Sequence, residues 1–181
     1  DMLKGEMSVV QQIVIKYIKN NLLPYDIAHP NFVTLKVEDT FHHPFEFEVN
    51  GVKRTVILEG RADRVDSLDN GLLRIIDYKT GKDEVTIESI DLLLKGNHNK
   101  MAIFQLLIYC MLYKQMHPEN TLPLRPVIYL LRNVRSGIVN NVRIHRKEVL
   151  YSDVEEEFEQ FFRKIMDELF DESIDFTQTQ D

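Results

Sequence analysis

Two short segments, residues 60–67 and 72–78, flank the turn sequence Asp69-Asn70-Gly71, and this arrangement constrains the fold more than any other feature of the chain. The turn residues between them predict two antiparallel strands joined as a hairpin, with the apolar Val65, Ile75 and Ile76 beside the charged residues. If the loop has three residues, with a type I turn and Gly71 in the left-handed conformation, Leu68 pairs with Leu72. A two-residue loop is the alternative, and it would turn the paired side chains to opposite faces.

The three-residue register brings three charged side chains together. It places Asp63 directly opposite Asp77, and Lys79 shares a face with Asp77 because alternate residues of a strand point to the same side. Opposed carboxylates repel each other, so a cation or a tight network must compensate. Carboxylates hold hard divalent cations, and a lysine beside them can orient a water and a phosphate. This pattern predicts a metal site for phosphodiester cleavage; a surface ion network around Lys79 is the alternative.

Gln105 and Tyr109 add a polar pair to an otherwise apolar helical segment, residues 100–117. The two residues are four apart, so they lie on one face of the predicted helix. The glutamine either belongs to a narrow exposed stripe or is a buried amide that points at a ligand. Taken by itself, the pattern favours the exposed stripe.

The remaining segments predict a single domain over residues 1–181 with an α/β or α+β sandwich fold, in which helices flank one mixed sheet. It is not a serial βαβ repeat. Ser152 and Glu155 stand at capping-box spacing at the start of a final helix. The polar residues 171–181 are expected to form a loose tail. The other expected elements are a helix over residues 3–23 that ends before Pro24, strands over 32–37, 45–49 and 52–58, a loop over 82–99, a strand over 126–131 and a second one over 139–145.

Composition excludes several classes of protein. The apolar stretches are too short to span a membrane and the N-terminus is no signal peptide, so we expect no membrane contact and a cytoplasmic location. Cys110 is the only cysteine, so this fragment alone can hold neither a disulfide framework nor an iron-sulfur cluster. The net charge of −7 argues mildly against a nucleic-acid partner. A local basic patch could offset it, unless these residues form a solvated loop: Arg132, Arg135, Arg143, Arg146 and Lys147.

Three motifs of this sequence resemble those of the PD-(D/E)xK nuclease superfamily, in particular its RecB-like and AddB-like branch. Residues 60–66 match G-x-x-D-R-x-D, residues 75–80 match [IV]-x-D-[YF]-K-[TS], and residues 105–109 match Q-x-x-x-Y. The motifs anchor roughly the middle third of the chain. The resemblance implies a restriction-endonuclease-like core, a central mixed β-sheet flanked by helices.

The resemblance also implies roles for individual residues. Asp63, Asp77 and Lys79 would be catalytic, and Lys79 would orient or deprotonate the attacking water. Mg²⁺ or Mn²⁺ would be bound by Asp63, Asp77 and the main-chain carbonyl of Tyr78. Supporting and DNA-contacting roles would fall to Gln105, Tyr109, Arg64 and Thr80, with Arg64 bracing the hairpin and Thr80 hydrogen-bonding near the lysine.

The sequence departs from the branch in two places. Members usually carry a further His or Glu ahead of the first metal aspartate, and the first helix here has no histidine. Glu38 is the best substitute and Glu6 the second, although either side chain could be a plain surface charge. Members with an iron-sulfur cluster carry cysteines after the last helix, a region that this chain does not reach. The missing initial Met and the abrupt polar end suggest a domain excised from a larger protein.

The expected function is therefore a metal-dependent deoxyribonuclease domain within a DNA repair or recombination protein, beside a helicase-like region of the same or a partner protein. Its substrates would be DNA ends or single strands, and exonuclease action is expected ahead of endonuclease action. The alternative is a non-cleaving DNA-binding or scaffolding domain whose nuclease site is incomplete.

Overall fold

A five-stranded mixed sheet forms the centre of the computed structural model, which describes residues 2–28, 31–95, 98–131 and 138–175, with side chains from residue 7 onward. Its strand order is β1-β2-β3-β5-β6. β3 and β5 run parallel, whereas the other neighbours are antiparallel. The predicted mixed sheet is thereby confirmed. The strands are β1 (Phe32–Val49), β2 (Val52–Leu68), β3 (Leu72–Lys79), β5 (Leu124–Leu130) and β6 (Val139–Asn141).

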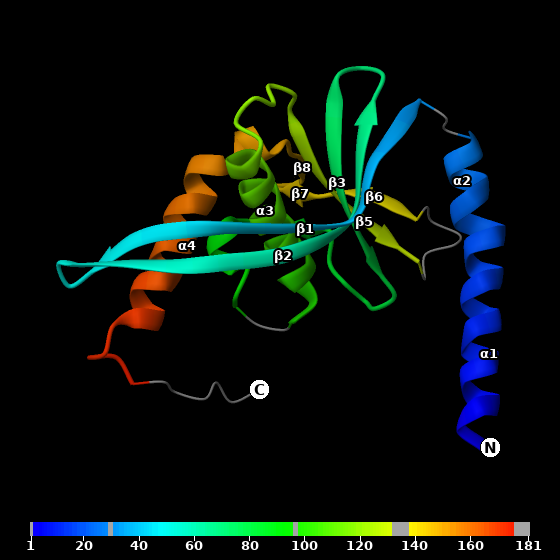
Figure 1. Cartoon of the computed structure of the whole chain (residues 1–181), viewed down its shortest axis with the longest axis horizontal. Coiled ribbons are helices and arrows are strands. Elements are labelled where there is room, and N and C mark those ends of the chain that lie inside the picture. Colours follow the sequence, from blue (N-terminus) through cyan, green and yellow to red (C-terminus); the bar gives the residue numbers. More distant parts are fainter. Residues whose placement is uncertain (1, 29–30, 96–97, 132–137, 176–181) are drawn as a thin grey trace.

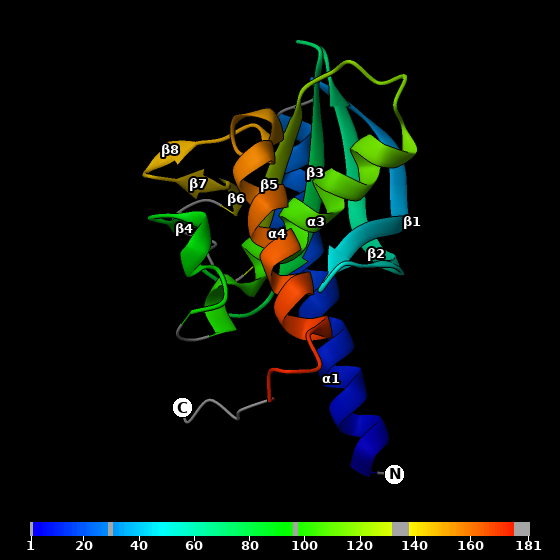
Figure 2. The same ribbon diagram turned by 90° about the vertical axis from the view of Figure 1, so that its left-hand side faces the viewer.

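Two helices cover one face of this sheet. Helix α3 (Met101–Met116) lies in the crossover between the parallel strands β3 and β5, which cannot be joined by a tight turn. Helix α4 (Glu155–Phe170) packs beside it, as Figures 1 and 2 show. Short elements fill the connections: β4 (Thr86–Ile87), η2 (Ile90–Leu92), η3 (His98–Lys100), β7 (Arg143–Ile144), β8 (Lys147–Glu148) and η4 (Tyr151–Asp153). Strands β4, β7 and β8 form a second, small sheet.

Helix α3 is the centre of the core, as its apolar sequence predicts. Buried side chains line most of its length, including Ile103, Leu106 and Leu107, which are fully inaccessible. Aromatic rings join α4 to the hairpin of β1 and β2, because Phe162 meets Phe45 edge to face at 5.1 Å between centroids. Together these contacts fix the sheet, α3 and α4 as one packed unit.

The predicted capping box at the start of the last helix is not formed. Ser152 lies in η4, and the N-cap position of α4, Val154, makes no side-chain hydrogen bond. The Asp153 carboxylate instead accepts the Leu150 N–H at 2.8 Å. The spacing of Ser152 and Glu155 fits a capping box, but Ser152 is part of the 3₁₀ helix η4 and therefore is not the N-cap residue of α4. Of the expected loose tail, residues 176–181 lie outside the described part.

The N-terminal helix differs from its prediction. Helix α1 (Met2–Tyr17) continues through a π-helical turn, η1 (Ile18–Leu22), into α2 (Leu23–Ala28), so helical structure does not end before Pro24. Pro24 has no N–H to donate, and a π-helical turn, in which the Leu23 N–H reaches back to the Ile18 carbonyl, directly precedes it in the helix. Leu22 packs on the second face of the sheet against Ile76 and Val127. Helix α1 itself projects away from the sheet (Figures 1 and 2).

Strands β1 and β2 form one long hairpin that reaches α4, rather than the four shorter strands expected from the sequence (Figure 1). Its tip is the Asn50-Gly51 turn, with positive φ at both residues, as hairpin turns of this type require. Pro44 interrupts the sequence pattern without ending β1, because β1 is an edge strand and edge strands accommodate proline.

Candidate active site

The turn between β2 and β3 has the three-residue geometry that the sequence predicts. Gly71 has a φ of 75°, and its N–H donates to the Leu68 carbonyl at 3.0 Å. Leu68 pairs with Leu72, and the register continues to the pair of Arg64 and Ile76. The two-residue alternative is thereby excluded, and the backbone pairing ends one position before Asp63 and Asp77.

Asp63 closes the end of the β2–β3 ladder with its side chain. Its Oδ2 accepts the main-chain N–H of Tyr78 at 2.7 Å, beyond the last backbone pair. A strand residue directs its N–H and C=O toward the same neighbour, so the Tyr78 carbonyl also points to the β2 side. The structure thus brings Asp63 and the Tyr78 main chain together.

Asp77 is a buried carboxylate with a cationic neighbour. It is 4% exposed, and its Oδ2 lies 2.8 Å from the Lys79 ammonium. Burial raises the pKa of Asp77; the Lys79 ammonium opposes this rise, and the charges of Asp63 and Asp83 add to it. A buried acid among other acids lacks a full counter-charge, which a bound cation would supply.

Lys79 is held by a chain of side chains that begins on α3. Its ammonium donates to Gln105 Oε1 at 3.0 Å, and the Gln105 amide donates in turn to the Tyr109 hydroxyl. The Tyr109 ring lies against Gly60 of β2, where an added Cβ would overlap it. Gln105 therefore does not belong to an exposed polar stripe of α3, because its side chain links this helix to Lys79.

The other acidic and basic residues of the first motif lie on the opposite face. Arg64 forms ion pairs with Asp66 at 2.9 Å and with Asp26 of α2 at 2.8 Å. Arg74 also binds Asp66, at 2.7 Å, and the two residues are paired across the strands β2 and β3. This buried network ties β2, β3 and α2 together, and Arg64 lies within it rather than facing the acids of the site.

Two further predicted residues lie at the surface, and the side chain of a third is outside the described part. Glu38 is an exposed residue of β1 whose carboxylate pairs with Arg61 at 3.2 Å. Thr80 is exposed just after β3, and the side chain of Glu6 lies outside the described residues. Within the described ranges, no group of three His, Cys, Asp or Glu side chains is placed to bind a metal.

The predicted basic patch is only partly described. Arg132 and Arg135 fall outside the described residues. Arg143 and Arg146 pair with Glu148 and Glu88, at 3.3 and 3.2 Å. These two arginines are therefore neutralised at the surface.

A two-acid site nevertheless suits one kind of metal. Mg²⁺ keeps several of its waters in proteins and takes only one or two carboxylates. Asp63 and Asp77 provide these two groups, and the Tyr78 carbonyl is directed to the same side. The residues present therefore fit a hard, water-rich divalent cation.

Sequence reasoning missed two acids, one close to the site and one in the ion network on the opposite face. Asp83 lies on the loop after β3, close enough to raise the pKa of Asp77. Asp26 reaches Arg64 from α2, 38 residues away in sequence. Neither belongs to a motif, and only the tertiary structure shows them; the closeness of Asp83 to Lys79 in the sequence is the one hint available.

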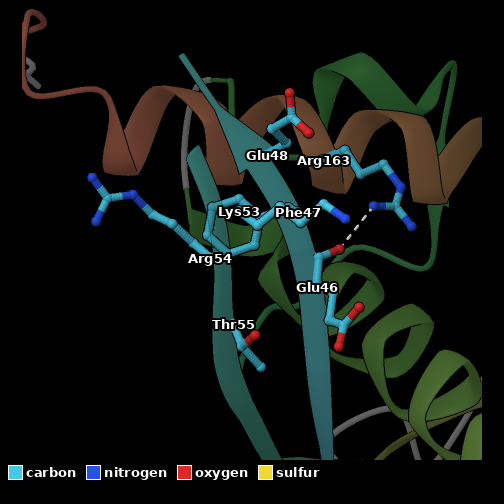
Figure 3. A pocket seen from close by; sticks show the side chains of 7 residues that line it. All are labelled: Glu46, Phe47, Glu48, Lys53, Arg54, Thr55 and Arg163. Atoms are coloured by element: carbon cyan, nitrogen blue, oxygen red, sulfur yellow. Dashed lines mark hydrogen bonds between the residues drawn. The ribbon is translucent and has the colours of Figure 1, made fainter. Parts of the chain in front are cut away.

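A surface hollow of about 360 Å³ lies elsewhere, between the hairpin tip and α4. Figure 3 shows Arg163 of α4 reaching across it to the Glu46 backbone carbonyl, at 3.0 Å. Its lining combines acids with the basic Lys53 and Arg54 and contains no motif residue. We assign it no part in the chemistry.

This chain is similar to known proteins in the following respects. The family model of the PD-(D/E)XK nuclease superfamily matches residues 5–181. The curated proteins give no match. A solved crystal structure, that of SSO0001, aligns with a TM-score of 0.36 and 19% identity over 88% of this chain. The alignment spans 63% of the solved chain, and at this TM-score it supports no conclusion.

The matched family has a known general chemistry. Its members are nucleases that generally use divalent metal ions. No helix in the described part of the chain is both long and apolar enough to cross a membrane. Because the family model matches nearly the whole sequence, the chain belongs to the PD-(D/E)XK nuclease superfamily.

Proposed function

We propose that this chain is a metal-dependent deoxyribonuclease domain of the RecB-like and AddB-like branch, acting as an exonuclease on DNA ends or single strands. One observation carries the proposal: the buried Asp77 lies beside Lys79, which Gln105 of the third motif also holds. The second and third motifs thus converge on one ammonium group, and Asp63 of the first motif accepts the N–H of the neighbouring Tyr78.

The proposed ligands of Mg²⁺ or Mn²⁺ are Asp63, Asp77 and the main-chain carbonyl of Tyr78. Such an ion lowers the pKa of a bound water and offsets charge on a phosphoryl oxygen. Binding it would also keep Asp77 ionised, against the burial that raises the pKa of this carboxyl. Glu38 is left out of the proposed set, because its carboxylate is exposed and pairs with Arg61.

Lys79 is the proposed positioning and charge-stabilising group. An ammonium has three N–H donors, and two acceptors already surround this one: Asp77 Oδ2 and Gln105 Oε1. The remaining N–H is available to the attacking water or to a phosphate oxygen. Tyr109 acts one step further away, because it orients the Gln105 amide. Thr80, exposed at the end of β3, is proposed to contact the DNA strand.

The wider setting is also part of the proposal. We place the domain in a DNA repair or recombination protein of the cytoplasm, next to a helicase-like region in the same or a partner protein. The three motifs support this setting through their resemblance to that branch.

A second candidate is a DNA-binding or scaffolding domain that does not cleave. It is favoured by one observation, that the described residues place only two acids, with no third side-chain ligand, at the site. Calorimetry with Mn²⁺ separates the two functions. A nuclease site should take up Mn²⁺ and lose it in Asp77→Ala, whereas the second candidate predicts no uptake.

Cleavage of end-labelled linear DNA, single strands and closed circles tests the first function directly. We expect cleavage in Mg²⁺ or Mn²⁺, none in chelator, and loss of activity in Asp77→Ala and Lys79→Ala. Asp91 and Lys95 form an exposed ion pair at 3.2 Å and offer matched controls. Asp91→Ala and Lys95→Ala should cleave normally.

Each outcome of this assay has a meaning. Degradation of linear DNA but not of closed circles would support the proposed exonuclease action. Cutting of closed circles would show endonuclease action instead. Cleavage that survives both Asp77→Ala and Lys79→Ala would rule out the site described above.

A further inference from the structure

In the long hairpin of β1 and β2, the side chains of β2 that face α3 change from even-numbered to odd-numbered residues partway along the strand. Near the tip, even-numbered residues of β2 face the core, and both Leu58 and Ala62 pack with the cluster around α3. Beyond this point the odd-numbered Val65 belongs to the same cluster, whereas Arg64 lies on the other face against α2. Because strand side chains alternate, β2 must rotate between Ala62 and Arg64, at Asp63.

Strand β1 shows the matching irregularity at the same rung. The rung of Glu38 and Asp63 is skipped, whereas its two neighbours are paired and join Val37 to Arg64 and Asp39 to Ala62. Glu38 has a φ of 50°, in the left-handed region that L-residues other than Asn and Asp rarely adopt. The rotation of β2 and the unusual backbone of β1 therefore lie directly opposite each other.

The position of Glu38 is unusual among residues of this conformation. The other described non-glycine residues with positive φ are Asn50, His145 and Arg146. All three lie in the turns of hairpins, where such angles are required. Glu38 alone among these four lies within a strand, so a turn does not account for it.

The side chain of Glu38 does not explain the conformation either. Its carboxylate pairs with Arg61, and the two side chains are 64% and 62% exposed. Exposed pairs of this kind add little to stability. What distinguishes this position is its backbone, which allows the rotation that directs Asp63 toward Tyr78.

We propose that Glu38 is a positioning residue that acts through its left-handed backbone: it permits the twist of the hairpin that aims Asp63 into the site. This inference deepens the proposed nuclease function, because Asp63 is one of the proposed metal ligands. It assigns no role to the Glu38 carboxylate. Residues that adopt positive φ readily should therefore replace it, and residues that do not should fail.

Four variants separate the backbone from the carboxylate. Glu38→Gly and Glu38→Asn remove the acid but favour positive φ, whereas Glu38→Gln keeps the size and removes only the charge. Glu38→Val, with a branched Cβ, strongly resists this conformation. Thr40→Gly, two residues along the same strand, controls for the general cost of glycine in β1.

The main measurement is hydrogen exchange of the Tyr78 amide by NMR, because this N–H donates to Asp63 whether or not the protein cleaves DNA. We expect Tyr78 to stay protected in Glu38→Gly, Glu38→Asn and Glu38→Gln, and to exchange about tenfold faster or more in Glu38→Val. Glu38→Gly should melt about 2–4 °C above wild type, whereas Thr40→Gly should melt below it. DNA cleavage should follow Tyr78 protection across the series.

Two results would overturn the inference. Loss of Tyr78 protection and of cleavage in both Glu38→Gly and Glu38→Gln would assign the role to the carboxylate. Alternatively, Glu38→Val could keep wild-type protection and melting temperature, which would leave the backbone without a role. If Glu38→Val does not fold, Glu38→Ala takes its place in the comparison. A wild-type protein with the expected exchange pattern but no cleavage would refute the nuclease function and leave this inference standing.

Discussion

The contact between Gly60 and Tyr109 gives the sharpest prediction about the site. A Cβ added at Gly60 would lie 2.9 Å from Cδ1 of Tyr109 and overlap the next ring atom. Carbon atoms at ordinary contact are about 3.5–4.0 Å apart, so Gly60→Ala must push the ring away by about 0.5 Å or more. The ring has little room, because Phe41 packs against it edge to face at 6.0 Å between centroids.

The displacement should cost both stability and turnover. Overpacking of a core typically costs about 1–3 kcal/mol, which corresponds to a fall in melting temperature of about 2–12 °C for a domain of this size. Moving Tyr109 also removes the partner of the Gln105 amide, which orients Lys79. Loss of one neutral hydrogen bond, about 0.5–1.5 kcal/mol, predicts turnover about two- to twelvefold slower.

A double-mutant cycle tests the reasoning. Tyr109→Ala removes the ring, so the added methyl group of Gly60→Ala should then cost almost nothing in thermal melts. The measured coupling between the two positions should equal most of the cost of Gly60→Ala alone. If the cost persists without the ring, or if Gly60→Ala melts and cleaves as wild type does, the proposed contact is wrong.

Three further predictions concern buried ionisable groups. Burial raises the pKa of Asp77, so the metal-free folded state holds a proton that the unfolded state has released. The free energy of unfolding should therefore fall as pH rises from the ordinary aspartate pKa, about 3.9, through the raised one. Urea titrations at several pH values should show that this free energy depends less on pH in Asp77→Asn than in the wild type. An equal pH dependence in both proteins would contradict the burial argument. Asp66 is fully buried between two arginines, so Asp66→Ala should cost about 3–5 kcal/mol in urea melts, against less than about 0.5 for the exposed Asp69→Ala; similar values for both would remove the network's structural role. Burial also raises the pKa of the Cys110 thiol, so a thiol reagent should label it only after unfolding, and rapid labelling of the native protein would refute its placement in the core.

The geometry of the acids could be predicted from local sequence rules. Gly71 fixed the loop length, the loop length fixed the register, and the period of a strand then placed Lys79 beside Asp77. Helix α3 followed from its apolar length, within one residue at each end. These features depend on contacts between segments that are close in the sequence.

Features that depend on distant segments could not be predicted. The rotation of β2 after Ala62 requires the left-handed Glu38 on the neighbouring strand, and neither residue type signals it. Asp26 reaches Arg64 only because α2 continues past Pro24, whereas a proline in this position usually ends a helix. The continuous hairpin was hidden because Pro44 and Gly60 look like breaks until their edge position and their contact with Tyr109 are known.

The central claim is that Asp63 and Asp77 together bind a divalent cation. Anomalous diffraction from crystals soaked in Mn²⁺ tests it most directly, because Mn²⁺ scatters anomalously and prefers oxygen ligands. We predict a peak between the two carboxylates and next to the Tyr78 carbonyl, absent from Asp77→Ala crystals. Manganese bound only elsewhere, or no manganese at these acids in well-soaked crystals, would contradict the claim.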